Sequence, residues 1–199
     1  HPVADNPRMI PAQAPADETE RLAALVALQV LDTAPTSMFD ALVNAAAQVC
    51  GTPISLISLV DADRQWFKAN VGLPGVTQTP REVAFCAHTI LGEGLFEVHD
   101  ASADPRFADN PLVTGAPDIR FYAGAPLRLT NGAAVGTLCV IDREPRRLSD
   151  HQRSVLQQLA VAAAQALEAH RALQLQQQAL AAQARIRVLA DTAPVGVFA

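Results

Sequence analysis

Apolar residues recur at helical spacing over two stretches in the first quarter of the chain. Residues 17–31 carry such a stripe, and the acids of DETE lie at its N-terminal end, where the helix dipole favours negative charge. A second helix is predicted over 37–50, with Thr36 or Ser37 as its cap, Ser37 and Asp40 spaced as a capping box, and Gly51 after its end. Residues 1–16 are rich in Pro and Ala without periodicity, which predicts a flexible lead-in.

Continuous or alternating apolar runs predict the strands of a sheet. PISLISLVD (53–61) is apolar at almost every position, so both of its faces should be covered. The turn DADR leads into QWFKANVG (65–72), an expected antiparallel partner, and LFEVHD (95–100) has the pattern of a short strand. IRFYAGAPLRL and AAVGTLCVID flank TNGA, and Asn-Gly between two such runs is a strong hairpin signal. Between these runs, residues 82–91 have helical spacing and residues 103–113 contain enough breakers to predict a helical turn in a loop.

One long helix is predicted from Ser149 to about residue 190, and at 1.5 Å per residue it would span roughly 60 Å. A domain of this size cannot cover such a helix. After about residue 170 the apolar positions narrow to a seam spaced three and four apart, as in a coiled coil: Ala172, Leu175, Ala179, Ala182, Ile186 and Leu189. We therefore expect a parallel homodimer through residues 171–190. The whole pattern predicts an α+β fold, an antiparallel sheet with helices packed on it.

Composition narrows the classes of function. The chain has 199 residues, half of them hydrophobic and 18% charged, which suits one medium domain with an extension. Its net charge of -5 and the lack of a basic patch argue against nucleic acid and membrane surfaces as partners. No apolar run approaches the ~20 residues that span a bilayer, and no secretory signal is visible. The chain begins with His rather than Met, so we expect either an excised piece of a longer protein or the remnant of a tag. Three cysteines among apolar neighbours predict reduced, buried thiols in a cytoplasmic protein.

Several segments together resemble the GAF domain of bacterial signalling proteins, over residues 18–170. They are SLISLVDADRQWFKANVGL, FCAHTI, DASADPRFADNPLV, IRFYAGAPL and GTLCVIDREPRRLSDHQ. The resemblance implies a sheet of five or six strands, N- and C-terminal helices that pack on one face and often dimerise, and a small-molecule pocket under loops on the other. The most similar type precedes histidine kinase and diguanylate cyclase domains, which implies an output domain downstream in the same chain.

RIRVLADTAPVGVFA, at the end of the chain, resembles the start of a PAS domain. The expected organisation is a lead-in at 1–16, a GAF-like sensory domain at 17–170, a signalling helix at 171–190 and a truncated PAS-like start at 191–199.

Cys86 and His88 in EVAFCAHTIL (82–91) allow four interpretations. A metal site needs a third ligand, and the chain has no CxxC or HxxxH spacing, so no metal is expected. Covalent bilin attachment in phytochrome-like GAF domains uses a cysteine followed directly by histidine, but Ala87 intervenes here, so no covalent bilin is expected. A free methionine sulfoxide reductase would need a second sulfur, and DIRFYAG, where that family has its attacking cysteine, has none. The favoured interpretation is that Cys86 is a small core residue and His88 a hydrogen-bonded wall residue of the pocket.

The other candidates for the pocket are aromatic or charged. The aromatic candidates could form a wall against a planar ligand or simply pack in the core, and the sequence favours neither explanation. They are Trp66, Phe67, Phe85, Phe107, Phe121 and Tyr122. Trp66 and Lys68 share one face of their strand and Phe67 the other, so only one set can line the pocket. For Asp104 and Arg106 we favour an ion pair that stabilises an irregular loop over a role as a polar lid above the ligand. Arg120, between apolar residues, should pair with Asp100 or Asp104, or with an anionic ligand.

The preferred hypothesis is a sensory and dimerisation module that binds a small molecule and relays a signal along its C-terminal helix. This fragment itself is not expected to be an enzyme and has no expected catalytic residue. The alternatives are a thiol-dependent methionine sulfoxide reductase and a ligand-free GAF dimer spacer. The NKFDE-type residue set of phosphodiesterase GAF domains is not visible, so a cyclic nucleotide is not predicted, and the ligand's identity stays open.

Overall fold

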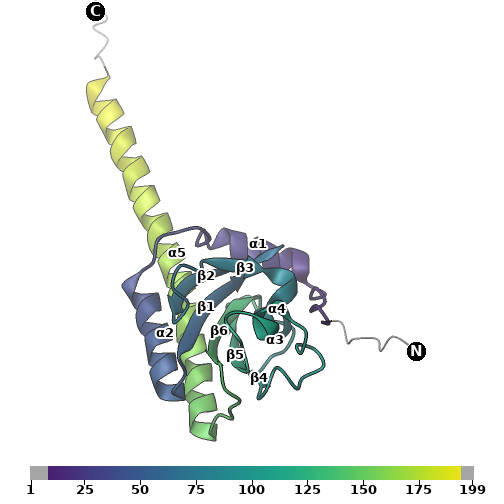
Figure 1. Cartoon of the computed structure of the whole chain (residues 1–199). Helices are drawn as coiled ribbons and strands as arrows, with labels where there is room; N and C mark the ends of the chain where they lie inside the picture. Colours follow the sequence, from purple (N-terminus) through teal and green to yellow (C-terminus); the bar gives the residue numbers. More distant parts are fainter. Residues whose placement is uncertain (1–8, 194–199) are drawn as a thin grey trace, which may run out of the picture.

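A six-stranded antiparallel sheet organises the computed structural model, which describes residues 9–193 (Figure 1). The strands lie in the order β3-β2-β1-β6-β5-β4, so the hairpins β1/β2 and β5/β6 are joined through β1 and β6. Their bounds are β1 Ile54–Val60, β2 Arg64–Val71, β3 Gln78–Pro80, β4 Phe96–Val98, β5 Phe121–Arg128 and β6 Ala134–Asp142. The predicted α+β architecture is therefore confirmed.

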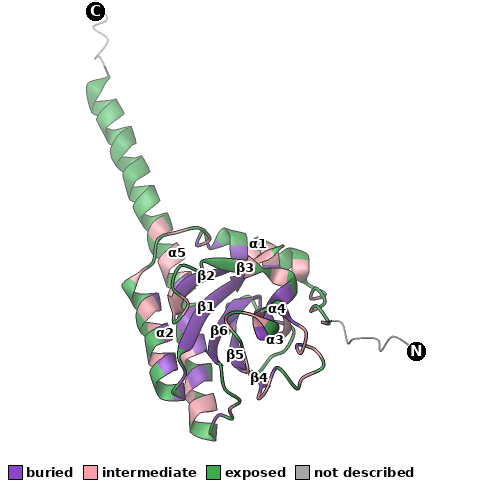
Figure 2. Ribbon diagram, viewed as in Figure 1, coloured by how far each residue is buried: buried purple, intermediate pink, exposed green. Residues whose placement is uncertain are grey.

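Three helices cover one face of the sheet: α1 (Glu18–Ala27), α2 (Ser37–Cys50) and α5 (Asp150–Thr192). Their apolar side chains, among them Leu25, Phe39 and Leu156, form one core with Ile57 of β1 and Leu138 of β6. Figure 2 shows the central strands β1, β2, β5 and β6 largely buried, whereas the edge strand β3 and the outer surfaces of these helices are exposed. We call this side of the sheet the helix-covered face.

Short helices and loops cover the opposite side, which we call the loop-covered face. They are η1 (Arg81–Val83), α3 (Phe85–Thr89), α4 (Pro111–Thr114) and the segment between β4 and β5. A second apolar cluster forms here between these elements and the strands. Because both faces are covered, β1 and β6 are buried at every position, as the continuous apolar run 53–61 predicted for β1.

The helix ends follow their local chemistry, with two corrections. Helix α2 has the predicted bounds, but the predicted capping box is wrong: Thr36 is the N-cap, and its buried Oγ1 has no hydrogen-bond partner among the described residues. Helix α1 ends at Ala27 rather than near residue 31, because Gln29 and Asp32 adopt φ of 50° and 58°, which a right-handed helix cannot accept. Ser149 caps α5 as predicted, and there a complete capping box forms with Gln152.

Helix α5 leaves the body of the molecule and continues alone (Figure 1). Every described residue from 175 onward is exposed. The predicted PAS-like start at 191–199 lies mostly outside the described residues, as do residues 1–8 of the lead-in. None of the described helices combines the length and apolar character needed to cross a membrane.

Candidate ligand-binding site

Aromatic side chains fill the centre of the loop-covered face. The rings of Phe85 and Phe107 stack with centroids 4.1 Å apart, and Tyr122 lies 5.2 Å from Phe85. His88 meets Phe107 edge-on at 4.9 Å. Four predicted pocket residues are therefore brought together, but they pack against one another and leave little space between them.

Cys86 lies beneath this aromatic cluster and is 2% exposed. Its Sγ accepts hydrogen bonds from Thr137 Oγ1 at 2.9 Å and from Tyr122 Oη at 3.3 Å, and the Tyr122 hydroxyl also meets Thr89 Oγ1 at 2.8 Å. Burial opposes ionisation of the thiol, but the neighbouring polar groups of Cys139, Thr137 and Tyr122 outweigh it and lower the pKa of Cys86. The residue thus has the buried environment that was predicted, with a polar network around its sulfur.

The fold also places a second thiol near Cys86, which the sequence analysis did not predict. Cys139 of β6 lies in the same buried cluster as Cys86, and both thiols are free. The two cysteines are far apart in the sequence, so no spacing motif predicts that they lie close together. Within residues 9–193, no group of three or more His, Cys, Asp or Glu side chains is arranged to hold a metal ion.

The loop after β4 is held by the ion pair that the sequence favoured. Both oxygens of the Asp104 carboxylate accept from Arg106, at 2.9 and 2.6 Å, and the Arg106 guanidinium lies above the rings of Phe96 and Phe107. Burial, together with the positive charge of Arg106, lowers the pKa of His88. The lowered pKa favours the neutral imidazole of His88, which lies in α3 and packs against Phe107 of this loop.

The expected pairing of Arg120 with Asp100 or Asp104 is wrong. Its guanidinium donates instead to the backbone carbonyls of Val113 and Ile119, at 2.9 and 3.0 Å. Asp100 accepts from the backbone and hydroxyl of Ser102, which closes a local turn. Carbonyl oxygens and partial exposure satisfy the charge of Arg120 without a carboxylate.

Three predicted pocket residues belong to the helix-covered face: Trp66, Lys68 and Phe121. Trp66 and Phe121 are part of the core beneath the helices. Lys68 occupies a β-bulge, because Phe67 and Ala69 pair with consecutive residues of β1 and leave it unpaired. Its Nζ donates to Thr33 Oγ1 and the Ala34 carbonyl, at 2.9 and 2.6 Å, above the ring of Phe39. These three side chains cannot contact a ligand under the loops.

An apolar cavity of about 340 Å³ opens beside the aromatic cluster, on the same face of the sheet. Strands β1, β2 and β6 form its floor, and the segments 72–79 and 112–119 form its walls. Its lining residues are Leu56, Gln65, Phe67, Gly72, Leu73, Pro74, Val76, Thr79, Leu112, Ala116, Pro117, Ile119, Ile141 and Arg143. Phe67 is the predicted site residue among them. The loop 72–79 and Arg143 were not predicted.

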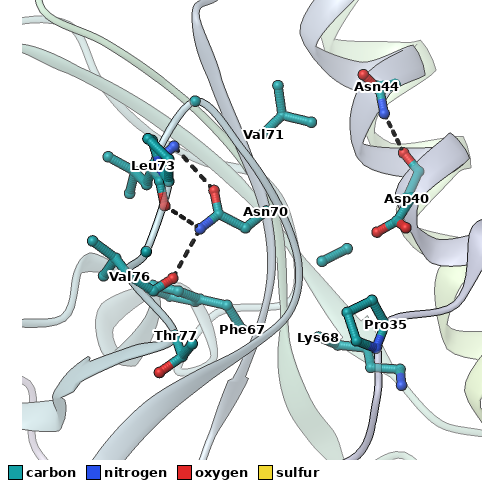
Figure 3. A pocket seen from close by; sticks show the side chains of 14 residues that line it. Pro35, Asp40, Asn44, Phe67, Lys68, Asn70, Val71, Leu73, Val76 and Thr77 are labelled. Atoms are coloured by element: carbon teal, nitrogen blue, oxygen red, sulfur yellow. Dashed lines mark hydrogen bonds between the residues drawn. The ribbon is translucent and has the colours of Figure 1, made fainter.

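Asn70 shapes the loop that walls this cavity. Its Nδ2 donates to the carbonyls of Leu73 and Val76, at 2.6 and 2.9 Å, and its Oδ1 accepts from Leu73 N at 3.1 Å. Figure 3 shows these bonds from the adjoining edge hollow, of about 570 Å³, which also borders α2. Gly72 begins the loop with φ of +87°, and a Cβ there would lie 2.1 Å from the Pro53 carbonyl oxygen. The wall is therefore built by specific residues, and a Gly-Leu-Pro-Gly run with a preceding Asn was its signal in the sequence.

Comparison with known proteins identifies the family. The sequence model of the GAF domain matches residues 34–167. This chain belongs to the GAF domain family. A cyclic di-GMP phosphodiesterase of Pseudomonas aeruginosa is 53% identical over 132 residues, which is 66% of this chain and 22% of that protein. The chain thus spans about a fifth of the length of this curated relative.

Solved GAF domains share the fold at low sequence identity. One, from a phosphoenolpyruvate-protein phosphotransferase of Coxiella burnetii, has a TM-score of 0.59 at 15% identity and covers 79% of this chain and 96% of its own. A free methionine-R-sulfoxide reductase of Thermoplasma acidophilum has a TM-score of 0.56 at 13% identity, covering 67% and 92%. At such identities the likeness shows the fold of this GAF domain and carries nothing about its chemistry.

The cavity of the GAF domain is close in sequence and in space to the start of α5. Ile141 and Arg143 line the cavity, and Ser149 caps the helix six residues after Arg143. Between them, Arg146 donates to the Asp142 carboxylate and to the Cys50 carbonyl. Glu97 of β4 accepts from Leu148 N and from Arg153 of α5, at 3.1 and 2.8 Å. This hydrogen-bonded connection ties the cavity floor to the first turn of the helix.

Proposed function

We propose that this GAF domain is the sensory and dimerisation module of a longer signal-transduction protein. A small molecule binds in the apolar cavity, and its presence is relayed through α5. The observation that carries the proposal is the connection just described: the strand that ends in the cavity lining leads, through the Arg146 and Glu97 hydrogen bonds, into the capped start of α5. A ligand that displaces the end of β6 has a short mechanical route to the helix.

The proposed output is cyclic di-GMP turnover. The relative from Pseudomonas aeruginosa is named a cyclic di-GMP phosphodiesterase, and the matched region is about a fifth of it. We infer that this GAF domain regulates such an enzyme, located downstream in the same cytoplasmic chain, with a PAS-like segment starting near residue 191. A histidine kinase is the other output that the sequence left open. Hydrolysis of cyclic di-GMP by a chain that carries the downstream part tests this directly.

Dimerisation is proposed through the N- and C-terminal helices. The seam residues Leu175, Ile186 and Leu189 are 49%, 67% and 70% exposed. Val26 of α1 and Val161 of α5 are exposed to a similar extent. An apolar stripe of this length in water favours a partner helix, and the spacing of Leu175, Ala179, Ala182, Ile186 and Leu189 fits a parallel second copy.

The relay is tested by changing the phase of α5. Seven residues inserted after Gln176 add nearly two full turns and should preserve regulation, whereas four should rotate the downstream seam, because each residue turns the helix by about 100°. Both insertions are compared in the chain that carries the output domain, by its activity and by sedimentation. Equal regulation in the two, or a monomer at micromolar concentration, would refute the relay.

The packed aromatic cluster favours one other candidate, a ligand-free dimer spacer. Here the centre of the loop-covered face is filled by Phe85, Phe107 and Tyr122 themselves. The variant Val76→Trp, which fills the cavity from its exposed wall, separates the two functions. It should alter regulation if the cavity holds a ligand and leave it unchanged if the domain is a spacer.

A further inference from the structure

Among the described residues that line the apolar cavity, only Arg143 has a charged side chain. Arg143 follows the last residues of β6 and lies at the solvent-exposed end of the lining, while the rest of the floor and walls is almost wholly apolar, as with Leu56, Phe67, Ile119 and Ile141. The cavity therefore combines a hydrophobic interior with a cation near its mouth.

The Arg143 guanidinium has no carboxylate partner among the described residues. Its neighbour Asp142 accepts from the backbone N–H of Arg143 and Glu144, and its other oxygen accepts from Arg146 at 3.0 Å. The neighbouring carboxylate is thus occupied by a different arginine, and Arg143 is free to bind an external anion.

The two polar side chains inside the cavity bind each other. Gln65, which is 5% exposed, accepts from Ser58 Oγ at 3.0 Å and donates to Thr79 Oγ1 at 2.6 Å. A ligand with many hydroxyl or amide groups would lose hydrogen bonds to water and find few in return. This disfavours sugars and nucleotides inside the cavity.

The cavity volume limits the size of the ligand. A water molecule takes about 30 Å³ in the liquid, so 340 Å³ holds roughly eleven groups of that size. That is the size of a medium-chain or single-ring molecule and lies at the lower end of the range for small-molecule sites.

We propose that the ligand class of this GAF domain is a small apolar carboxylic acid, with its hydrocarbon part in the cavity and its carboxylate on Arg143. This inference rests on the proposed function and names the ligand class of the same site. A cation would be repelled by Arg143, and a neutral apolar molecule would gain only the hydrophobic part of the binding free energy.

Calorimetric titration with octanoate, octanamide and octylammonium tests the class, since the three share a chain and differ in charge at the head. Octanoate should bind about tenfold tighter than octanamide, because a charge-assisted bond to guanidinium is roughly twice as strong as a neutral one, and octylammonium should bind weakest. Arg143→Gln should remove the preference for octanoate and keep octanamide binding. Arg147→Gln, at an exposed arginine outside the lining, is the matched control and should keep the preference.

The outcomes test two claims separately, namely that the ligand is an anion and that it binds in this cavity. Equal binding of octanoate and octanamide, both lost in Val76→Trp, would overturn the anionic class and leave the cavity as the proposed binding site. A preference that survives Arg143→Gln, or is lost in Arg147→Gln, would also overturn it. No binding by any of the three probes would count against the proposed function itself, and binding unaffected by Val76→Trp would place the site elsewhere.

Discussion

A buried arginine on α1 makes the stability of this domain depend on one carboxylate. Arg21 is 1% exposed, and its Nε and Nη2 donate to the two oxygens of Glu18, at 2.8 and 2.9 Å. Its Nη1 donates to the Val60 carbonyl of β1 at 2.7 Å, and Arg81 also donates to Glu18. The group joins α1 to the end of β1 and to η1. Without Glu18 the Arg21 charge would lie uncompensated in the protein interior.

The magnitude follows from the pKa of Glu18. Burial opposes ionisation, but the hydrogen bonds from Arg21 and Arg81 outweigh it and lower the pKa from 4.5 to about 2. At 1.36 kcal/mol per pKa unit this corresponds to about 3 kcal/mol, which we reduce to about 2 kcal/mol because one fifth of the side chain is exposed and the interaction is partly screened. Glu18→Gln should therefore lower the free energy of unfolding by about 2 kcal/mol at pH 7.

The pH dependence gives the sharper test. A carboxylate whose pKa falls on folding stabilises the native state fully above its ordinary pKa of 4.5, and this stabilisation is lost as pH falls toward 2. Urea denaturation of the parent protein and of Glu18→Gln at several pH values between 7 and 2.5 should show the two curves converging at low pH. Glu20→Gln, on an exposed acid of the same first turn, should cost only the helix-dipole term of about 0.3–1 kcal/mol. A cost that is constant with pH, or equal in the two variants, would refute the reasoning.

Three further changes test the packing around the site. Gly72→Ala should destabilise the domain by several kcal/mol more than Gly75→Ala in thermal or urea unfolding, because both have positive φ but only Gly72 lies against the Pro53 carbonyl; equal costs would contradict the close approach. Phe107→Ala should cost about 3–5 kcal/mol, since its ring is 1% exposed and stacked on Phe85; a loss below ~1 kcal/mol would mean that the aromatic cluster is loosely packed. Cys86→Ser should remain folded, and neither it nor the parent protein should reduce free methionine sulfoxide in a dithiothreitol-coupled assay; turnover by the parent that the variant lacks would assign Cys86 a catalytic role.

Local patterns in the sequence determined most of the secondary structure. Apolar spacing and the Asn-Gly turn predicted α2, α5, β1 and the hairpin β5/β6, because each depends on residues within a few positions of one another. The Ser149 cap could be predicted for the same reason, and the motifs of the GAF family could be recognised in the sequence. Strand β3 was missed, since its three residues have no apolar pattern and form only by pairing with the edge of β2.

The candidate site was decided by the tertiary structure. Alternation along β2 put Lys68 on the same face as Trp66, but only the packing decided that this face lies under the helices, and Arg120 finds carbonyl oxygens that a sequence pattern cannot place. Cys139 reaches Cys86 only because β6 runs beneath α3. The cavity is the space left where three strands and two loops meet, and Arg143, the charged residue in its described lining, directly follows β6. Such a space depends on the packing of many distant side chains at once, whereas periodicity and turn chemistry report only on near neighbours in the chain.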